Sequence, residues 1–274
     1  MKLLLSFFLF CISLAVSAQQ KPEFDYGRNP AAGGYKYING INMYYEIYGT
    51  GKPLLFLHGN GGSIAGARGK IDYFKKYFKV VAIDSRGHGK SIDTTTSILT
   101  YNQMAEDIKI LLDSLQIDSA YVSGQSDGGI LGLLLAINYP DKISKLITFG
   151  ANLFPGKKAV FNEIDDLVLD TLKATKDFNT RRLFSLMAYQ PDIKEKDLHK
   201  IKCPVLIVSG DRDAIRLEHS LKIFYNIENA NLFIMPGSTH FGSVQKPDLF
   251  NSVAMDFLNK PFSKRSTVDI FTGK

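Results

Sequence analysis

Residues 121–129 read YVSGQSDGG, and the apolar run ILGLLLA follows at residues 130–136. This pattern indicates a short buried strand, a sharp turn at Ser126 and a buried helix. Gly124, Ser126 and Gly128 match G-x-S-x-G, a motif that holds its serine in strained backbone angles at such a turn. Side chains at Gly124 or Gly128 would collide with the neighbouring strand and helix, so we interpret both glycines as making room for the turn.

Units of the same kind, a strand followed by a glycine-containing loop and a helix, lie on both sides of this turn. Their alternation predicts an α/β fold with a mainly parallel sheet and helices on both faces. Asn39-Gly40 predicts a hairpin, so the first two strands should pair antiparallel at a sheet edge. The eight expected strands lie at residues 35–38, 41–48, 53–57, 79–83, 121–124, 145–149, 204–208 and 232–235.

The strand pattern is interrupted after the sixth expected strand. Between residues 153 and 199 glycine almost disappears, and Ile164, Leu167, Val168 and Leu172 have helical spacing. We expect two or three helices here, inserted as a small cap. The core of the fold then comprises residues 19–152 and 200–262, and the polar tail at residues 263–274 should be loose.

The first 18 residues differ from the rest of the chain. A charged start at Lys2 precedes an almost unbroken apolar run from Leu3 to Val16, and small residues end at Ala18. This predicts a secretory signal peptide cut before Gln19, and therefore a secreted or periplasmic protein. A transmembrane anchor is the alternative, but the run is short for a membrane span.

Composition narrows the class of protein. The chain has 274 residues, 45% hydrophobic and 22% charged, which suits a globular protein with a sizeable core. The net charge of +6 is dispersed, without a basic stripe interleaved with aromatics, so we expect no nucleic-acid partner. After signal cleavage we expect no membrane span and one cysteine, Cys203, which is interpreted as a buried small hydrophobe. Composition leaves the oligomeric state open.

Three candidate catalytic residues follow expected strands in the order Ser126, Asp213, His240. Functional groups gather at the carboxyl ends of strands in an open parallel sheet, so these side chains should meet. His240 could take the proton of the Ser126 hydroxyl, and a buried carboxylate would orient the imidazole. Asp211 and Asp213 follow the same strand. We prefer Asp213, because it lies farther along toward the histidine, and assign Asp211 to the turn.

A serine nucleophile also needs donors for the oxyanion that forms on its substrate. We expect these to be the backbone N–H groups of Asn60 and Asp127. The Asp127 side chain has two interpretations of equal weight. It pairs with an ammonium group of the substrate, or it accepts a hydrogen bond from backbone within the turn at Ser126. Arg86 is interpreted as bracing its loop. The remaining histidines, His58, His88, His199 and His219, are assigned to structure.

Taken together, these motifs resemble the α/β-hydrolase fold family over residues 35–260. The motifs are His58-Gly59-Asn60-Gly61-Gly62, Asp84-Ser85-Arg86-Gly87-His88-Gly89-Lys90-Ser91, the turn at Ser126, Gly210-Asp211-Arg212-Asp213 and Gly237-Ser238-Thr239-His240-Phe241. Within that family the chain is similar to the valacyclovir-hydrolase (biphenyl-hydrolase-like) branch at Gly124-Gln125-Ser126-Asp127-Gly128-Gly129-Ile130, Tyr139-Pro140, Gly150-Ala151-Asn152 and Cys203-Pro204. The resemblance implies a serine hydrolase without metal or organic cofactor.

The expected function is therefore cleavage of a small carboxylic ester, or a related amide or lactone, through an acyl-enzyme on Ser126. Haloalkane dehalogenases and epoxide hydrolases share the fold but use an aspartate nucleophile, so Ser126 argues against both. Aminopeptidase-like and carbon–carbon bond hydrolases on the same triad stay open. So does a hydrolase-like protein that only binds or senses its ligand.

Overall fold

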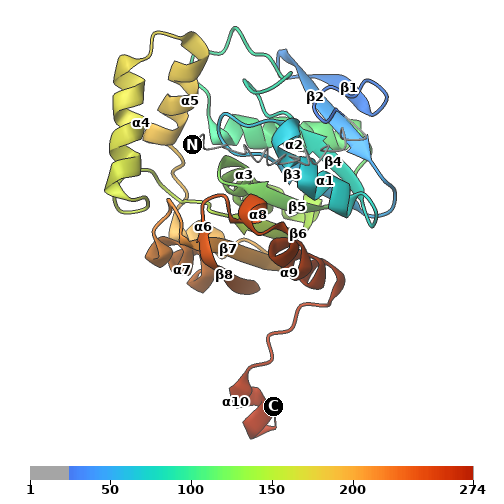
Figure 1. Ribbon diagram of the computed structural model, residues 1–274. Coiled ribbons are helices and arrows are strands. Elements are labelled where there is room, and N and C mark those ends of the chain that lie inside the picture. The colour runs from blue at the N-terminus through green and yellow to red at the C-terminus, as the bar shows by residue number, and fades with distance from the viewer. Residues whose placement is uncertain (1–24, 274) are drawn as a thin grey trace, which may run out of the picture.

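A computed structural model describes residues 25–273, and the predicted signal peptide at residues 1–18 lies outside them. Within the described residues eight strands form one sheet, in the order β1-β2-β4-β3-β5-β6-β7-β8 (Figure 1). Neighbours from β4 to β8 pair in parallel, which confirms the predicted mainly parallel sheet. The strands are β1 (Gly33–Ile38), β2 (Ile41–Tyr48), β3 (Pro53–Leu57), β4 (Lys79–Ile83), β5 (Ala120–Gln125), β6 (Ile143–Phe149), β7 (Val205–Arg212) and β8 (Ala230–Thr239).

The hairpin at one edge of the sheet forms as its turn sequence predicts. β1 pairs antiparallel with β2, and β1 is the edge strand. Both turn residues have positive φ, 45° at Asn39 and 87° at Gly40, which is the requirement of a type I′ turn. Because β2 also pairs antiparallel with β4, the hairpin extends the parallel sheet by two strands.

Helices cover both faces of the sheet, because alternate strand residues point to opposite sides. In β3, Leu55 and Leu57 pack in the cluster that contains α2 and α3, whereas Leu54 and Phe56 pack in the cluster that contains α1 and α9. The helices of the core are α1 (Arg68–Phe74), α2 (Tyr101–Ser114), α3 (Asp127–Asn138), α7 (Leu217–Tyr225), α8 (Gly242–Gln245) and α9 (Pro247–Asn259), with short 3-10 turns η1 (Ile64–Ala67) and η2 (Pro140–Lys142).

Three helices lie between β6 and β7: α4 (Asn162–Ala174), α5 (Phe178–Tyr189) and α6 (Glu195–Leu198). They fall within the segment expected as a cap. α4 and α5 pack as a pair to one side of the sheet (Figure 1). The pair differs in burial: α4 buries only Leu172, whereas α5 buries Arg182, Leu183 and Leu186.

Several strands differ from the expected bounds by one or two residues, and two larger departures lie in the C-terminal part of the fold. β7 and β8 run on to Arg212 and Thr239, which pair with each other beyond an irregularity at Gly210. Their polar ends lie outside the apolar runs, so hydrophobic pattern alone could not show them. In the tail, α10 (Thr267–Thr272) begins with a capping box made by Ser266 and extends away from the body (Figure 1). None of the helices in residues 25–273 has the length and apolar character that a membrane span needs.

Candidate active site

The turn between β5 and α3 holds Ser126 in a strained backbone conformation with a positive φ. Its φ is 54° and its ψ is −117°, and its backbone N–H donates to the Phe149 carbonyl at 2.7 Å. A Cβ added at Gly124 would lie 2.1 Å from the Gly128 carbonyl oxygen, and one added at Gly128 would lie 2.1 Å from the Leu57 carbonyl oxygen. Both glycines are therefore required by close approach of backbone, as expected, and the hydroxyl of Ser126 is held at the start of α3.

Asp213 and His240 are brought together from the ends of β7 and β8. The His240 Nδ1 and the Asp213 Oδ1 lie 2.6 Å apart. Asp213 also accepts backbone N–H bonds from Gly210 and Ile215, each at 3.1 Å. Burial alone would raise the pKa of Asp213, but the bond to His240 and these donors outweigh it and hold the pKa below its ordinary value. Asp213 is therefore ionised and fixed against the imidazole.

Asp211, the other candidate acid, lies near the end of β7 and has a different role. Its carboxylate accepts the backbone N–H groups of Gly237 at 2.7 Å and Ser238 at 3.0 Å. These bonds lower the pKa of Asp211. Asp211 thus ties the end of β7 to β8 just before His240, whereas the sequence analysis assigned it to the turn after its own strand.

Ser126 and His240 line one cavity of about 520 Å³. The hydrogen bonds of the described residues include none between their side chains, and such bonds often shorten only when substrate is bound. The side chain of Gln125 connects the segment before Ser126 to the segment that carries His240, which the sequence did not reveal. Its amide donates to the His240 carbonyl at 2.8 Å and accepts from the Ser243 hydroxyl at 3.1 Å. Gln125 thereby fixes the histidine loop to the residue before the serine.

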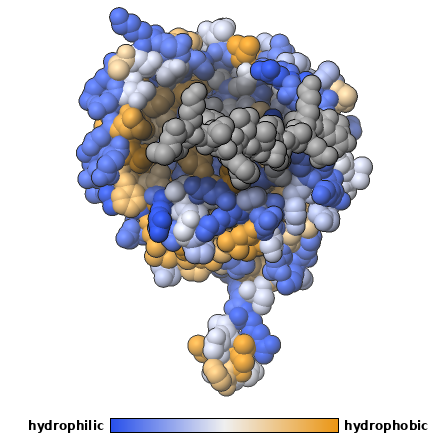
Figure 2. All heavy atoms as spheres, viewed as in Figure 1, coloured by the Kyte–Doolittle hydropathy of each residue, from blue (hydrophilic) through white to orange (hydrophobic). Residues whose placement is uncertain are grey.

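The cavity lies between the core and the cap. Cap residues form one wall, and Figure 2 shows hydrophobic side chains in a hollow beside the cap helices. An apolar cavity with a few polar groups is typical of small-molecule sites. No three His, Cys, Asp or Glu side chains in residues 25–273 are grouped so that they could hold a metal ion. The cap residues that line the cavity include Val160, Ile164, Val168 and Met187.

Two backbone donors are available beside Ser126. The hydrogen bonds of residues 25–273 include none in which the N–H of Asn60 or of Asp127 is the donor. Asp127 opens α3, so its N–H belongs to the first turn, where amide groups have no partner within the helix. The loop that carries Asn60 passes close to the serine: a Cβ added at Gly59 would lie 3.1 Å from the Ser126 Cβ. The positions suit a site for an oxyanion.

The Asp127 side chain is buried at the wall of the cavity. Its carboxylate accepts from the Asn60 amide at 2.9 Å, and the Tyr101 hydroxyl also bonds to it. Neither partner is the backbone group that one sequence interpretation assumed. Burial raises the pKa of Asp127 against the opposing effect of these two donors. Tyr101 was missed by sequence reasoning, because nothing in the pattern of α2 distinguishes its first residue.

Two of the other histidines, His58 and His219, have structural hydrogen bonds to the backbone of loops. His58 accepts the Ser85 N–H at 3.0 Å and bonds the Gly59 carbonyl at 2.8 Å, so both ring nitrogens are used. His219 accepts the Leu153 N–H at 2.9 Å. Burial lowers the pKa of His58 and of His219 to about 4. These neutral rings fix loops around the site.

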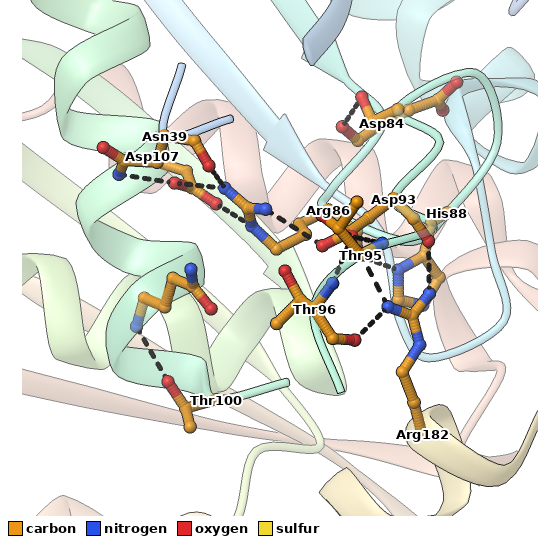
Figure 3. A network of polar contacts seen from close by, with 12 residues as sticks. Asn39, Asp84, Arg86, His88, Asp93, Thr95, Thr96, Thr100, Asp107 and Arg182 are labelled. Atoms are coloured by element: carbon orange, nitrogen blue, oxygen red, sulfur yellow. Dashed lines mark hydrogen bonds and ion pairs between the residues drawn. The ribbon is translucent and has the colours of Figure 1, made fainter. Parts of the chain in front are cut away.

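A buried ion network joins the core to the cap (Figure 3). Arg86 donates to Asp107 at 2.7 Å and to Asp93 at 2.9 Å, and all three side chains are fully buried. Arg86 therefore braces its loop, as the sequence indicated. Arg182 of α5 donates to the carbonyls of Asp93 and Thr96, both at 2.6 Å. The cap helix α5 is thus fixed to the same loop.

Comparisons with known proteins agree with this architecture. A model of the alpha/beta hydrolase fold family matches residues 52–184. The serine hydrolase BPHL of Mus musculus is 28% identical over 250 residues, covering 81% of this chain and 84% of that protein. The 2-hydroxy-6-oxo-6-phenylhexa-2,4-dienoate hydrolase of Burkholderia cepacia is 27% identical over 269 residues, covering 81% and 93%.

A solved structure extends the likeness to the fold. The crystal structure of an alpha/beta hydrolase enzyme from a Medee basin deep-sea metagenome library superposes with a TM-score of 0.76 at 20% identity. The match covers 85% of this chain and all of that one. At this identity the likeness speaks for the architecture.

Proposed function

We propose that this chain, of which residues 52–184 match the alpha/beta hydrolase fold family, is a serine hydrolase acting through an acyl-enzyme on Ser126. Its substrate is a small carboxylic ester, or a related amide or lactone. Hydrolase activity has the support of the family and of both relatives, whose names are those of hydrolases. The choice of Ser126 as nucleophile is supported by the geometry of the site.

The observation that carries the proposal is the bond of 2.6 Å between His240 Nδ1 and Asp213 Oδ1 at a cavity that Ser126 also lines. An ionised carboxylate at Nδ1 keeps the proton on that nitrogen. Nε2 is then the nitrogen with a free lone pair, so it can act as a base toward the serine hydroxyl.

The reaction follows from these positions. Nε2 of His240 removes the proton of Ser126 as Oγ attacks the substrate carbonyl, and Asp213 stabilises the imidazolium that forms. The oxyanion receives the N–H groups of Asn60 and Asp127, aided by the positive end of α3. His240 then protonates the leaving group. Water, deprotonated by the same imidazole, attacks the acyl-enzyme and releases the acid.

A fluorophosphonate probe tests the nucleophile directly. We expect labelling of Ser126 in the folded protein and none in Ser126→Ala. A panel of p-nitrophenyl esters, aminoacyl esters and short peptide anilides then separates ester from amide cleavage, and a vinylogous diketone substrate tests carbon–carbon cleavage. A folded protein that binds these compounds but neither reacts with the probe nor turns any of them over would be a ligand-binding protein.

A narrower substrate class is supported by Asp127: we propose that its carboxylate binds an ammonium group on the substrate, as in an amino-acid ester. The carboxylate lies one residue from the nucleophile, is 4% exposed, and has only the uncharged donors Asn60 and Tyr101 as hydrogen-bond partners. A buried charge without an opposite charge in direct contact gains much from a cationic ligand.

Exchange of the charge at Asp127 tests this narrower class. Asp127→Asn should reduce kcat/KM for aminoacyl esters by about tenfold or more, the factor expected for a charge-assisted hydrogen bond, while plain acyl esters change little. The two substrate series are compared on the same enzyme preparation. Equal losses on both would show that the carboxylate holds Asn60 and Tyr101 in place and does not recognise an amine.

We also propose that the mature protein acts outside the cytoplasm, as a secreted or periplasmic enzyme. The proposal is supported by the charged start, the apolar run and the small residues of positions 1–18. N-terminal sequencing of the exported protein should begin at Gln19. Recovery of Met1 on a membrane-bound protein would instead indicate an anchor.

A further inference from the structure

Among residues 25–273, Lys70 is the one lysine or arginine that lines the cavity containing Ser126. Lys70 lies on α1, and its side chain is half-buried. Its Nζ is 6.0 Å from the centre of the Phe56 ring and 5.8 Å from that of Phe250. α1 lies across the molecule from α4 and α5 (Figure 1), and residues of α1 and of both cap helices line the cavity.

Lys70 differs from the polar groups around the serine in having no partner. Gln125 bonds to the histidine loop, and Asp127 bonds to Asn60. Among residues 25–273 the Lys70 ammonium has neither a hydrogen bond nor an ion pair, and two aromatic rings at the limit of cation–π range are its neighbours.

The charge of Lys70 is nonetheless retained. Burial lowers the pKa of Lys70 to about 8, so the ammonium stays mostly protonated at pH 7. A cation in apolar surroundings is unfavourable unless it is paired. A ligand that supplies the opposite charge would relieve this cost, and Lys70 is one of the residues that line the cavity with Ser126.

We propose that Lys70 determines specificity by binding a carboxylate on the part of the substrate that extends from Ser126 toward α1. The inference rests on the proposed function and narrows its substrate to esters that carry an anionic group. A single carboxylate matches a single ammonium. A dianionic phosphate fits less well, because the same cavity is lined by the carboxylates of Asp127 and Asp165.

Matched ester pairs test the inference, since the two members of a pair differ by the presence of one carboxylate. Mono-p-nitrophenyl glutarate against p-nitrophenyl pentanoate places the carboxylate on the acyl side, and 4-acetoxybenzoate against phenyl acetate places it on the leaving group. In at least one pair the wild type should prefer the anionic ester. Lys70→Met should lower kcat/KM for that ester by about tenfold or more and leave its neutral partner within about twofold.

Two further variants separate recognition from structure. Lys70→Arg should retain most of the preference for the anionic ester, and Lys76→Met, which removes an exposed lysine just after α1, should change neither member of a pair. An anionic-to-neutral ratio that is the same in wild type and Lys70→Met, in both pairs, overturns the inference. Mono-p-nitrophenyl phosphate as a competitor distinguishes phosphate from carboxylate binding: stronger inhibition by it than by glutarate contradicts the choice of carboxylate.

Binding to an inactive protein distinguishes failure of this inference from failure of the proposed function. Calorimetry on Ser126→Ala, with and without Lys70→Met, measures affinity for each ester without turnover. Tighter binding of the anionic ester that is lost with Lys70→Met supports the inference even if the wild type hydrolyses none of them. Equal affinities for the two esters reject it even if Ser126 is labelled by the fluorophosphonate.

Discussion

At the scale of single residues, the position of the His240 imidazole depends on the space left by a glycine. Gly150 directly follows β6 with a φ of 63°, and a Cβ added there would lie 2.6 Å from His240 Cε1 and 2.7 Å from Nδ1. The ring is thus enclosed between the carboxylate of Asp213 and a bare stretch of backbone. A side chain at position 150 must move it.

We expect Gly150→Ala to lower ester kcat/KM by about 100-fold, because small displacements of a catalytic group have effects of this order. The alanine displaces the imidazole from Asp213 while the rest of the site stays. Gly40→Ala in the β1–β2 turn is the control, since its φ is also positive, at 87°, and a Cβ there meets nothing within 4 Å. Both variants carry backbone strain, so an equal loss of activity in the two would contradict this account.

The residue scale is also where sequence reasoning reached its limit. Ser126, Asp213 and His240 could be selected because each follows a strand whose apolar run is visible. Lys70 and Tyr101 could not, since they line the cavity through the packing of α1 and α2, and helical periodicity describes only which face is buried. The Gln125 amide was missed for the same reason: its partners are more than 110 residues away in the chain.

At the scale of elements, the two long cap helices are attached to the core in different ways. α5 inserts Arg182, whose side chain is 3% exposed, into the loop that Arg86 also holds. α4 contacts chiefly α5. The cap was expected from the loss of glycine and the change of period, but its attachment depends on Asp93, a loop residue whose role no local pattern indicates.

Removal of the Arg182 guanidinium should loosen the cap without unfolding the core. We expect Arg182→Met to lower the free energy of unfolding by about 1–3 kcal/mol, from buried carbonyls left without donors, and to raise KM for esters. Arg181→Met, at an exposed neighbouring position, is the control. Urea unfolding and steady-state kinetics measure the two effects. An unchanged KM in Arg182→Met would show that α5 is held by its apolar contacts alone.

At the scale of the whole molecule, buried histidines link stability to pH. His88 and His219 are 5% and 2% exposed, and burial lowers the pKa of each to about 4. Histidines in an unfolded chain have a pKa of about 6.5 and so bind protons that the folded state excludes. The stability that these neutral rings contribute is therefore complete above about pH 6.5 and is lost as pH falls toward 4.

The lowered histidine pKa values make the free energy of unfolding depend on pH, and this dependence can be measured. Between pH 4.5 and 6, His219→Gln should reduce the dependence of the unfolding free energy on pH by up to about 1.4 kcal/mol per pH unit, the contribution of one proton. Glutamine can still accept the Leu153 N–H, so the stability at pH 7 should change less. Ile98→Gln, at an exposed position that carries no titratable group, should leave the slope as it is. Denaturant titrations across this pH range decide between the two outcomes.

The buried strands of the core could be predicted more accurately than the helix in the C-terminal tail. Strand β3 spans the expected residues 53–57 and β4 the expected residues 79–83, because both are buried runs bounded by polar loops. α10 was not expected, because the C-terminal tail is polar. The helix is stabilised at its N-terminus by the capping box that Ser266 forms with Asp269. Sequence pattern reports burial well, and it reports local hydrogen bonding at exposed helix ends poorly.

The unequal attachment of the cap helices bears on how this enzyme could acquire new substrates. Leu172 is the one buried residue of α4, yet Ile164 and Val168 of this helix line the cavity. Variation there reshapes what the enzyme admits while folding proceeds unharmed. Substitutions that change the substrate, in natural or laboratory evolution, should therefore be tolerated more often in α4 than in α5.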